Sequence, residues 1–420
     1  MSNNDKTLTK THERLFKKDF TLVVLGQIIS IFGNSVLRFA LPLYILDQSG
    51  SAALFGAVSA LAFLPMIIMS PVGGIIADRV NKQRIMVALD FLTAALIIGF
   101  MIVSGHTSIT PLVIIMMMLL YGIQGAYSPA VQASLPLLVS GENLVPANAV
   151  VNLVNSFSGL LGPVVGGMLY AGYGLEPILQ VSAGCFALSA VMELFIRIPH
   201  QRRDTKGGML AIVRDDMRES VHFILKERPV LAKGIVLLFC FNIFLSSMIV
   251  IGLPVLVTQT LNMGSRLYGI AQGVMAAGGL AGGLVAGVFG KKLKINNIYL
   301  LLVVCAAGIL PMVLALLPGV PVMVSYIVIT VMCFLLMISA TLFSIKMLAF
   351  VQAQTPVNIV GKVISFLMAV SMCSQPIGQA LYGVLFERLA AFPWVVMLGA
   401  CIASFLTALF SKRVYSRLSE

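Results

Sequence analysis

Charged residues are scarce in this chain. Of its 420 residues only 10% are charged and 59% are hydrophobic, whereas a soluble domain has about 25% charged residues. This composition excludes a soluble globular protein. It indicates a chain that lies largely within a lipid bilayer.

Cysteine and histidine, which build disulfide frameworks and most metal sites, are few and scattered. The cysteines lie in separate apolar runs without close spacing, and we interpret them as small buried hydrophobic residues: Cys185, Cys240, Cys305, Cys333, Cys373 and Cys401. The histidines lie in loops or tails, outside any His-Glu-x-x-His arrangement: His12, His106, His200 and His222. We therefore expect neither a structural disulfide nor a metal site.

The sequence also lacks a nucleotide-binding loop. It contains no G-x-x-x-x-G-K-(S/T) pattern, so the chain is not expected to hydrolyse ATP. Because it shows no set of catalytic residues either, we expect neither an enzyme nor a cofactor. An ion gradient remains as the source of work.

Acidic residues are outnumbered by basic ones. The 16 Asp and Glu face 28 Lys and Arg, which gives a formal net charge of +12. In a soluble protein this excess would suggest nucleic acid. Here most basic residues fall in loops on the side of the N-terminus, while Arg266 and Arg388 lie opposite and Arg38 and Lys346 lie within apolar segments. This distribution predicts that both termini are cytoplasmic, and nucleic acid is not expected as a partner.

Long apolar segments are abundant. Segments of about 20 residues, the length that crosses a hydrocarbon core of roughly 30 Å, form two sets of six. Their first residues lie near Phe20, Ala52, Ile85, Pro111, Val145 and Leu175, and then near Val230, Leu267, Asn296, Val322, Val360 and Ala390. We predict an all-α membrane protein with twelve transmembrane helices in two six-helix bundles.

One long polar stretch, Arg197–Arg228, separates the two sets. Apolar residues recur there at every fourth position from Met209 to Leu225, which predicts an amphipathic helix along the cytoplasmic face. A regulatory role and a simple link between two rigid halves are both compatible with it. The predicted layout is a tail at 1–19, a bundle at 20–196, the linker at 197–229, a bundle at 230–411 and a tail at 412–420.

The loop at Gly74–Arg84 joins the second and third segments and is short enough to form a tight hairpin. We expect Gly74 to let a neighbouring helix come close, Asp78 to lie where the helix leaves the membrane, and Asn81 to adopt a left-handed turn conformation. Three basic residues predict that the loop is cytoplasmic: Arg79, Lys82 and Arg84.

The two halves repeat in sequence. Residues 73–82 align with residues 282–291, with the glycine pair retained and Asp78 replaced by Gly287. Parallel repeats of six helices are typical of secondary transporters whose substrate path lies between the halves. The repeat therefore predicts a pseudo-two-fold arrangement and a central path.

The hairpin pattern G-x-x-x-D-R-x-(G/N)-(K/R)-x-R resembles the signature loop of the major facilitator superfamily. Asn81 stands where that family usually has Gly, and Gln83 where it has a basic residue. Five further features are similar to its macrolide-efflux and siderophore-export branch: Gly26-Gln27, Gly50-Ser51-Ala52, Phe63-Leu64-Pro65, Ile85-Met86 followed by Asp90, and Gly361-Lys362-Val363. The resemblance covers roughly residues 20 to 410 and implies a conformational-switch loop formed by Gly74, Asp78, Arg79, Lys82, Arg84 and Asp90.

A glycine-rich stretch in the fifth segment resembles a motif found in exporters of that superfamily. It consists of Gly162, Pro163, Gly166 and Gly167, although Ser158 stands where a further Gly is usual. The resemblance favours export. Close helix packing explains the same glycines equally well, so both interpretations remain open.

Polar residues within the apolar segments are candidates for a substrate cavity, because such groups are costly in lipid. Arg38 is the principal one. It is expected either to face the cavity or to extend along the helix to the outer interface. The candidate set is Gln27, Asn34, Arg38, Gln124, Asn152, Asn155, Asn242, Gln272 and Gln375.

The acidic residues within the segments have less distinct roles. Asp90 is interpreted as a structural partner of Arg79, Arg84 or another basic loop residue, with a role as proton carrier as the alternative. Glu193 and Lys346 are interpreted as hydrated anchors near cytoplasmic helix ends. No residue stands out as the proton site.

These observations predict a multidrug-type exporter of the cell membrane. It would move an amphipathic small molecule, such as a macrolide-like drug, out of the cytoplasm by alternating access, as a monomer in the bilayer and as an antiporter with protons. The alternatives are an exporter or flippase of an anionic molecule, such as a siderophore or lysolipid, and a non-transporting membrane sensor or scaffold. Arg38 is the residue that favours an anionic substrate.

Overall fold

The computed structural model describes residues 15–106, 108–198, 217–289, 295–356 and 359–415. Within these ranges the chain is almost entirely helical, and twelve helical spans are long and apolar enough to cross a membrane. The predicted fold class is therefore confirmed.

The first half contains six helices. They are α1 (Lys18–Ser49), α2 (Ala52–Arg79), α3 (Lys82–Ser104), α4 (Ile109–Leu138), α5 (Leu144–Tyr173) and α6 (Glu176–Leu194). Local chemistry sets several of the boundaries. Gly50 ends α1 in the left-handed conformation, with φ of 63°, and the Ser51 side chain caps α2 by accepting a hydrogen bond from the Leu54 N–H.

The second half also contains six spans. The first of them, Pro229–Thr260, is assembled from α8 (Pro229–Phe241), a π-helical turn η3 (Asn242–Ser246), α9 (Ser247–Pro254) and a second π-helical turn η4 (Val255–Thr260). It is followed by α10 (Gly264–Phe289), α11 (Ile298–Ala315), α12 (Val322–Gln354), α13 (Val360–Arg388) and α14 (Pro393–Tyr415). π-Helical turns occur often at functional sites, and η3 contributes to one below.

The segment before the second half is described only from Met217 onward. It is helical to His222 and continues as a π-helical turn, η2 (Phe223–Glu227). Most of the predicted amphipathic helix lies outside the described residues. An ion pair of 2.6 Å between Glu219 and Lys362 attaches the described part to the start of α13.

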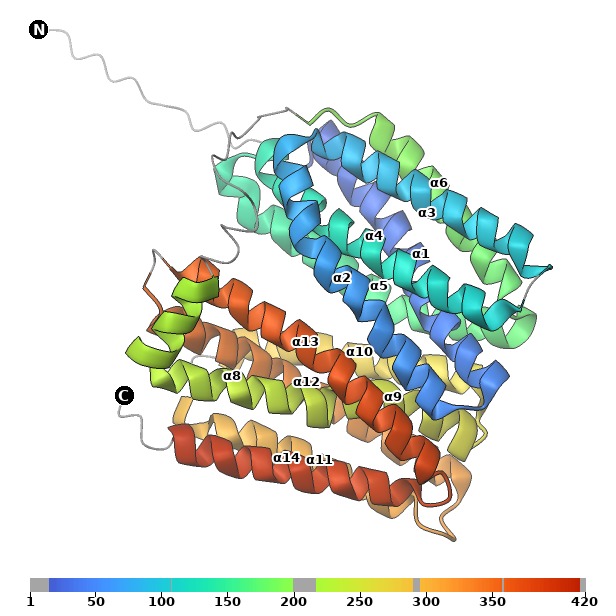
Figure 1. Cartoon of the computed structure of the whole chain (residues 1–420), viewed down its shortest axis with the longest axis vertical. Coiled ribbons are helices and arrows are strands. Elements are labelled where there is room, and N and C mark those ends of the chain that lie inside the picture. The colour runs from blue at the N-terminus through green and yellow to red at the C-terminus, as the bar shows by residue number, and fades with distance from the viewer. Residues whose placement is uncertain (1–14, 107, 199–216, 290–294, 357–358, 416–420) are drawn as a thin grey trace, which may run out of the picture.

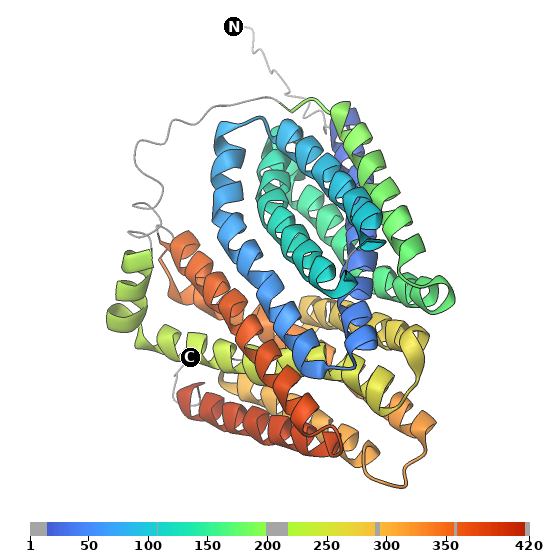
Figure 2. The same ribbon diagram turned by 45° about the vertical axis from the view of Figure 1, so that its right-hand side comes forward.

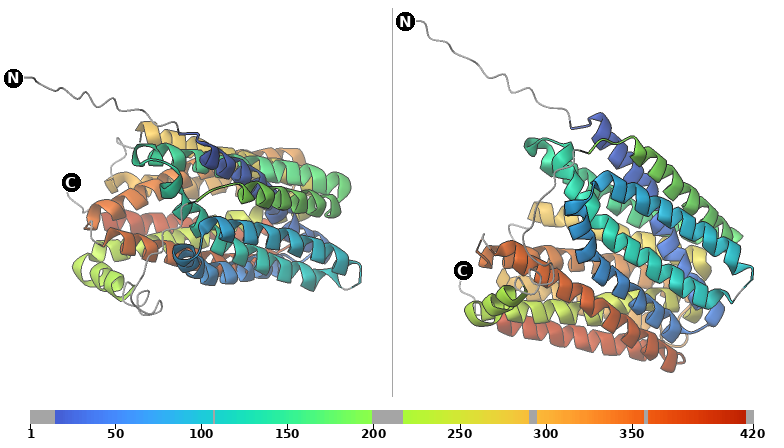
Figure 3. Two further views of the ribbon diagram at one scale, coloured as in Figure 1. Left: turned by 90° about the horizontal axis from the view of Figure 1, so that it is seen from above. Right: turned by 45° about the horizontal axis from the view of Figure 1, so that its top comes forward.

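The two halves form separate bundles, visible as the upper and lower groups of helices in Figure 1. Two helix pairs join them: α2 packs on α13, and α5 packs on α10. Figure 2 shows α2 and α13 crossing at one end and separating toward the other. The ends of the described chain lie on one side, as both views of Figure 3 show. We call this side the terminal face and the other side the opposite face.

Glycine pairs permit the closest contacts between the halves. A side-chain carbon on Gly56 would lie 2.8 Å from the Cα of Gly383, and one on Gly167 would lie 2.9 Å from the Cα of Gly269. Both pairs lie near the opposite face, because Gly56 is in the second turn of α2 and Gly269 in the second turn of α10. The halves therefore meet at the opposite face and diverge toward the terminal face (Figures 1 and 2).

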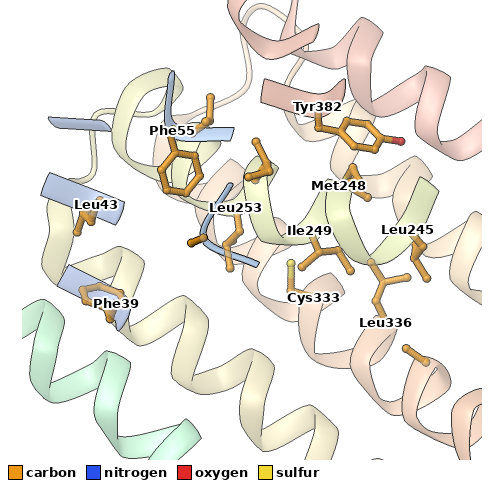
Figure 4. Packing of buried hydrophobic residues seen from close by; sticks show 14 of the residues in the cluster. Phe39, Leu43, Phe55, Leu245, Met248, Ile249, Leu253, Cys333, Leu336 and Tyr382 are labelled. Carbon is orange, nitrogen blue, oxygen red and sulfur yellow. The ribbon is translucent and has the colours of Figure 1, made fainter. Parts of the chain in front are cut away.

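The main cluster of buried hydrophobic residues crosses the boundary between the halves. Figure 4 shows Phe39, Leu43 and Phe55 of the first half to the left of Leu253 of α9, and Tyr382 of α13 to its right. All five side chains are at most 5% exposed. This shared apolar packing stabilises the contact at the opposite face.

The hairpin between α2 and α3 differs from expectation in two details. Asn81 has φ of −59° instead of a left-handed conformation, and its side chain caps α3 by accepting from the Gln83 N–H. The close helix contact falls on Gly73, where a side-chain carbon would lie 2.5 Å from the Cα of Ala126, whereas Gly74 has free space. The predictions for Asn81 and Gly74 were wrong, because an asparagine that caps a helix needs no positive φ, and because helix rotation decides which of two adjacent glycines faces a neighbour.

Candidate functional site

A central cavity of about 550 Å³ lies between the two halves. It is lined from both, by α1, α2, α4 and α5 on one side and by α9, α10 and α13 on the other. Six of the nine predicted cavity residues line it: Asn34, Arg38, Gln124, Asn155, Gln272 and Gln375. Its size falls within the range typical of small-molecule sites.

Arg38 is the charged group of the cavity wall. Its Cζ lies 4.1 Å from the centre of the Tyr121 ring, a distance typical of a cation–π contact. No described carboxylate lies within ion-pair distance of its guanidinium. Because Arg38 lines the cavity, its guanidinium N–H groups can donate hydrogen bonds to a ligand bound there.

Aromatic and amide side chains that the sequence analysis did not single out complete the wall. Phe39 and Tyr268 stack across the halves with ring centres 4.8 Å apart, toward the opposite face. Phe55, Ser59 and Gln379 also line the cavity, and so does Phe63, which the sequence indicated only as part of a family resemblance. The first three carried no signal in the sequence, because only their position between the halves distinguishes them from ordinary buried residues.

A second, more apolar pocket of about 330 Å³ lies within the second half, between η3, α9, α10 and α12. Val250 lines both spaces. The Gln375 amide donates to Asn242 Oδ1 at 3.2 Å and to Ser246 Oγ at 3.0 Å at their border. Asn242, a predicted cavity residue, thus faces this side pocket, whose walls include Met275 and Met337 together with Phe241 and Ile249.

Two predicted cavity residues lie elsewhere. Asn152 is exposed and does not line the cavity. Gln27 is buried within the first half, where its amide donates to the Tyr127 hydroxyl at 2.6 Å. The sequence placed both residues on membrane helices correctly but did not reveal that they face away from the space between the halves.

Gln27 belongs to a buried polar cluster in the first half. The Tyr127 hydroxyl donates in turn to Glu193 Oε1 at 2.8 Å, and Asp90 acts electrostatically on Glu193 and faces Ser189. Glu193 is 0% exposed and Asp90 3% exposed.

Two interpretations of these acids need correction. Glu193 is not a hydrated anchor, because α1 and α3 cover the end of α6: Gly26 makes room for the Glu193 side chain, and the Gln83 amide donates to the Glu193 carbonyl at 3.0 Å. Asp90 faces the bundle interior, whereas Arg79 and Arg84 are exposed. Hydration of a helix end depends on its neighbours, which the local sequence does not show.

A small space of about 20 Å³ lies beside Asp90. That is enough for a single water molecule, and the walls are polar: Ser30, Asn34, Gln124 and Tyr127. Asn34 and Gln124 also line the central cavity, and the Asn34 amide donates to Gln124 Oε1 at 2.8 Å. This amide pair separates Asp90 from the cavity.

The remaining residues of the switch loop lie around the α2–α3 turn. Lys82 is 7% exposed, Arg79 and Arg84 are exposed, and Asp78 lies near the end of α2 with its side chain outside the described residues. These residues therefore lie close to one another at the α2–α3 turn. Asp90 lies apart from them, in the interior of the first half.

The glycine-rich stretch of α5 faces two neighbours. A side chain at Gly162 would collide with Ser35 of α1, and one at Gly166 would lie 3.0 Å from the Phe39 ring. Gly167 packs on α10, and Pro163 lines the cavity. The stretch thus forms both a packing surface within the first half and part of the contact between the halves.

Two parallel bundles of six helices around a central cavity are the architecture of many secondary transporters. Comparison with known families agrees, since the family model of the Major Facilitator Superfamily matches residues 23–379 of this chain. The chain belongs to this superfamily of membrane transporters, which take small-molecule substrates.

Among curated proteins, the chain is similar to macrolide efflux protein A of Streptococcus pyogenes, with 24% identity over 388 residues, 92% of this chain and 94% of the relative. It is also similar to the multidrug efflux pump Tap of Mycobacterium bovis (strain BCG / Pasteur 1173P2), with 22% identity over 315 residues and 72% of each chain covered. Among solved structures, the nucleoside transporter NupG matches with a TM-score of 0.75 at 13% identity, covering 96% of this chain and 100% of that chain. At this identity the structural match shows the fold alone.

Proposed function

We propose that this protein exports amphipathic small molecules, such as macrolide-like drugs, from the cytoplasm by alternating access. The observation that carries the proposal is the central cavity of about 550 Å³, because it combines one cation, several amides and aromatic rings in one space between two movable halves. An amphipathic molecule needs both kinds of contact. The adjoining apolar side pocket, with its adaptable methionines, suits the apolar part of such a molecule.

The proposed direction is outward, with the terminal face in the cytoplasm. The basic loops of the terminal face support this orientation through the positive-inside rule. The similarity to proteins named for macrolide and multidrug efflux supports export. In this orientation the present conformation is inward-open, ready to take up a substrate from the cytoplasm.

The proposed energy source is the proton gradient, used by exchange of protons for substrate. Two buried acids in the first half, Asp90 and Glu193, supply groups that can bind and release a proton. We propose no enzymatic activity for the chain and no cofactor.

A second candidate is export of an anionic molecule, and Arg38 is the observation that favours it. Its guanidinium lines the cavity without a described carboxylate partner, and such a fork binds carboxylate or phosphate in a bidentate manner. Loss of Arg38 would then abolish transport of anions while neutral molecules are still moved.

Growth inhibition tests the proposal directly. Cells with and without the protein are exposed to a panel that contains erythromycin, a cationic dye and an anionic siderophore, each with and without a protonophore. We expect protection against erythromycin that disappears when the proton gradient collapses. Equal growth of both cell lines on every compound would refute export, and protection only against the siderophore would favour the second candidate.

A further inference from the structure

The buried cluster in the first half contains two acids, and among the residues that the structure describes no cation forms an ion pair with either of them. Glu193 and Asp90 are 0% and 3% exposed, and in each carboxyl group one oxygen is buried and has no hydrogen-bond partner: Oε2 of Glu193 and Oδ2 of Asp90. Burying an ionised carboxylate without a partner is very costly. Burying two of them side by side costs still more, because their like charges repel.

The groups that face the pair come from four helices. Helix α1 contributes Gln27 and Ser30, α4 contributes Tyr127, and α3 and α6 contribute the acids themselves. Among the described residues, the charge that acts on Glu193 is that of Asp90, and the hydrogen bond it accepts comes from Tyr127. Two groups lie further toward the terminal face on α3, the buried Lys82 and the exposed Arg84. The pair therefore has a neutral surrounding in which a bound proton relieves the cost of burial.

A route joins this pair to the substrate. The space of about 20 Å³ beside Asp90 has room for one water molecule, which needs two to four polar partners, and Ser30, Tyr127 and Asp90 are available there. The Asn34–Gln124 hydrogen bond forms its border with the central cavity. Any molecule that binds near Arg38 lies close to this border, because Asn34 and Arg38 are one helical turn apart on α1.

We propose that Asp90 and Glu193 together form the proton-binding site of the transporter, and that the Asn34–Gln124 pair is the barrier that protons cross between this site and the substrate cavity. The inference rests on the proposed proton-driven export and names the residues that bind the proton. While the cavity is open at the opposite face, an O–H bond of hydronium in the cavity breaks, its proton passes through the small space, and a new O–H bond forms on a carboxylate oxygen. When substrate enters from the terminal face, this carboxylic O–H bond breaks and the proton returns through the cavity to water as hydronium.

A measurement of the protons released on substrate binding tests the proposed site directly. Purified wild-type protein in weakly buffered detergent solution is mixed with erythromycin, and the released protons are followed with a pH-sensitive dye. The variants are Asp90→Asn and Glu193→Gln, which keep shape and polarity. The matched control is Asp47→Asn, which removes an exposed acid on α1 that accepts from Tyr170 outside the cluster. We expect release from the wild type and the control and about a tenfold smaller release from each cluster variant.

Transport in vesicles tests the coupling. We expect the cluster variants to lose accumulation of erythromycin driven by a pH gradient, and the Asp47→Asn control, which lies outside the cluster, to keep it within about twofold of wild type. Wild-type release together with equal release from both variants would overturn the site and leave proton-driven export intact. Absence of any proton effect in the wild type would instead refute the proposed antiport.

An infrared measurement covers the case of a variant that does not fold. The wild-type protein alone is titrated with acid, and the carbonyl band of protonated carboxylic acids is recorded in light and heavy water. We expect a band that shifts in heavy water, because the small space joins the buried cluster to water in the cavity, and that weakens on addition of erythromycin. A spectrum without such a band at any pH at which the protein stays folded would overturn the proposal.

Discussion

The Glu387 carboxylate, at the end of α13, accepts a hydrogen bond of 2.7 Å from the hydroxyl of Ser51, the residue that caps α2. The same carboxylate oxygen accepts from the Ala53 N–H at 2.9 Å. An acid of the second half thus lies at the N-terminus of a helix of the first half, where the helix dipole favours a negative charge. The contact forms at the opposite face, which is closed in this structure.

The Glu387 contact is expected to stabilise the conformation that is closed at the opposite face. Glu387→Gln keeps a hydrogen-bond acceptor but removes the charge, which at an exposed helix N-terminus contributes about 0.3–1 kcal/mol. We expect the ratio of closed to open molecules at the opposite face to fall about two- to fivefold. Distances between spin labels on the opposite-face ends of α2 and α13 measure this ratio.

The matched control is Glu176→Gln, which removes an exposed acid from the first turn of α6 at the same face. This control should leave the distances unchanged. An unchanged distance distribution in Glu387→Gln as well would mean that the carboxylate only caps α2 and does not bias the conformation.

A reciprocal contact is predicted for Asp78 at the terminal face. When that face closes, the start of α13 is expected to approach the end of α2, so that Asp78 meets the free N–H groups of α13. Asp78→Asn should shift the balance toward the terminal-face-open state by up to about tenfold, for 1.4 kcal/mol. Gly287→Asp, which adds an acid at the aligned position of the second half, should not restore the balance in the Asp78→Asn variant.

Spin labels on the terminal-face ends of α2 and α13 test the Asp78 prediction. The double variant with Glu387→Gln gives a sharper test, because the two substitutions are expected to shift the balance in opposite directions. If Asp78→Asn alone leaves the label distances as in wild type, Asp78 is a partner of the loop arginines and does not bias the conformation.

The glycine contact between α5 and α10 is predicted to be needed for closure of the opposite face. Gly167→Val places side-chain carbons against the backbone of Ser265 and Gly269, and overpacking of this kind costs about 1–3 kcal/mol. We expect the opposite face to open about tenfold more often and transport to slow. Gly172→Val, on the same helix but with free space around it, is the control. Equal transport rates and label distances in both variants would contradict this prediction.

Transport is predicted to depend on Arg38. Arg38→Ala should reduce erythromycin efflux strongly while expression stays close to wild type, and Arg38→Lys should restore it only in part, because the planar fork is lost. Arg388→Ala, at an exposed position at the end of α13, is the control. Full efflux of erythromycin by the alanine variant would show that Arg38 does not contact this macrolide.

The contact with Tyr121 allows a finer test of the cavity. Tyr121→Phe keeps an aromatic face under Arg38 and should leave the KM for efflux nearly unchanged, whereas Tyr121→Leu removes a contact of about 0.5–2 kcal/mol and should raise it. A change of equal size in both variants would point to the hydroxyl group instead of the ring.

Much of the architecture follows from local chemistry and was predictable. Twelve apolar runs near membrane length, separated by short polar loops, leave few alternatives to twelve helices, since every backbone polar group in lipid must be paired within its own segment. The repeat of the glycine pair at 73–74 and 282–283 indicated two related halves. The first residues of the helices were predictable to within a few positions, because each apolar run starts where a polar loop ends.

The polar residues were harder to interpret, because their roles depend on helix rotation and on neighbours far apart in the sequence. Asn34 and Gln27 lie on the same helix, yet one lines the central cavity and the other lies behind it, bonded to Tyr127. Glu193 is near a helix end and looked hydrated, but α1 and α3 cover it.

The sequence by itself determined the membrane class, the helices, the two halves and the basic loops, because hydrophobic length and charge act locally along each segment. Only the tertiary structure decided which acids are buried together, which amides separate Asp90 from the cavity, and that Glu387 reaches across to Ser51. These features arise where residues 90 or more positions apart meet, and a linear pattern holds no record of such contacts unless every helix is placed in space.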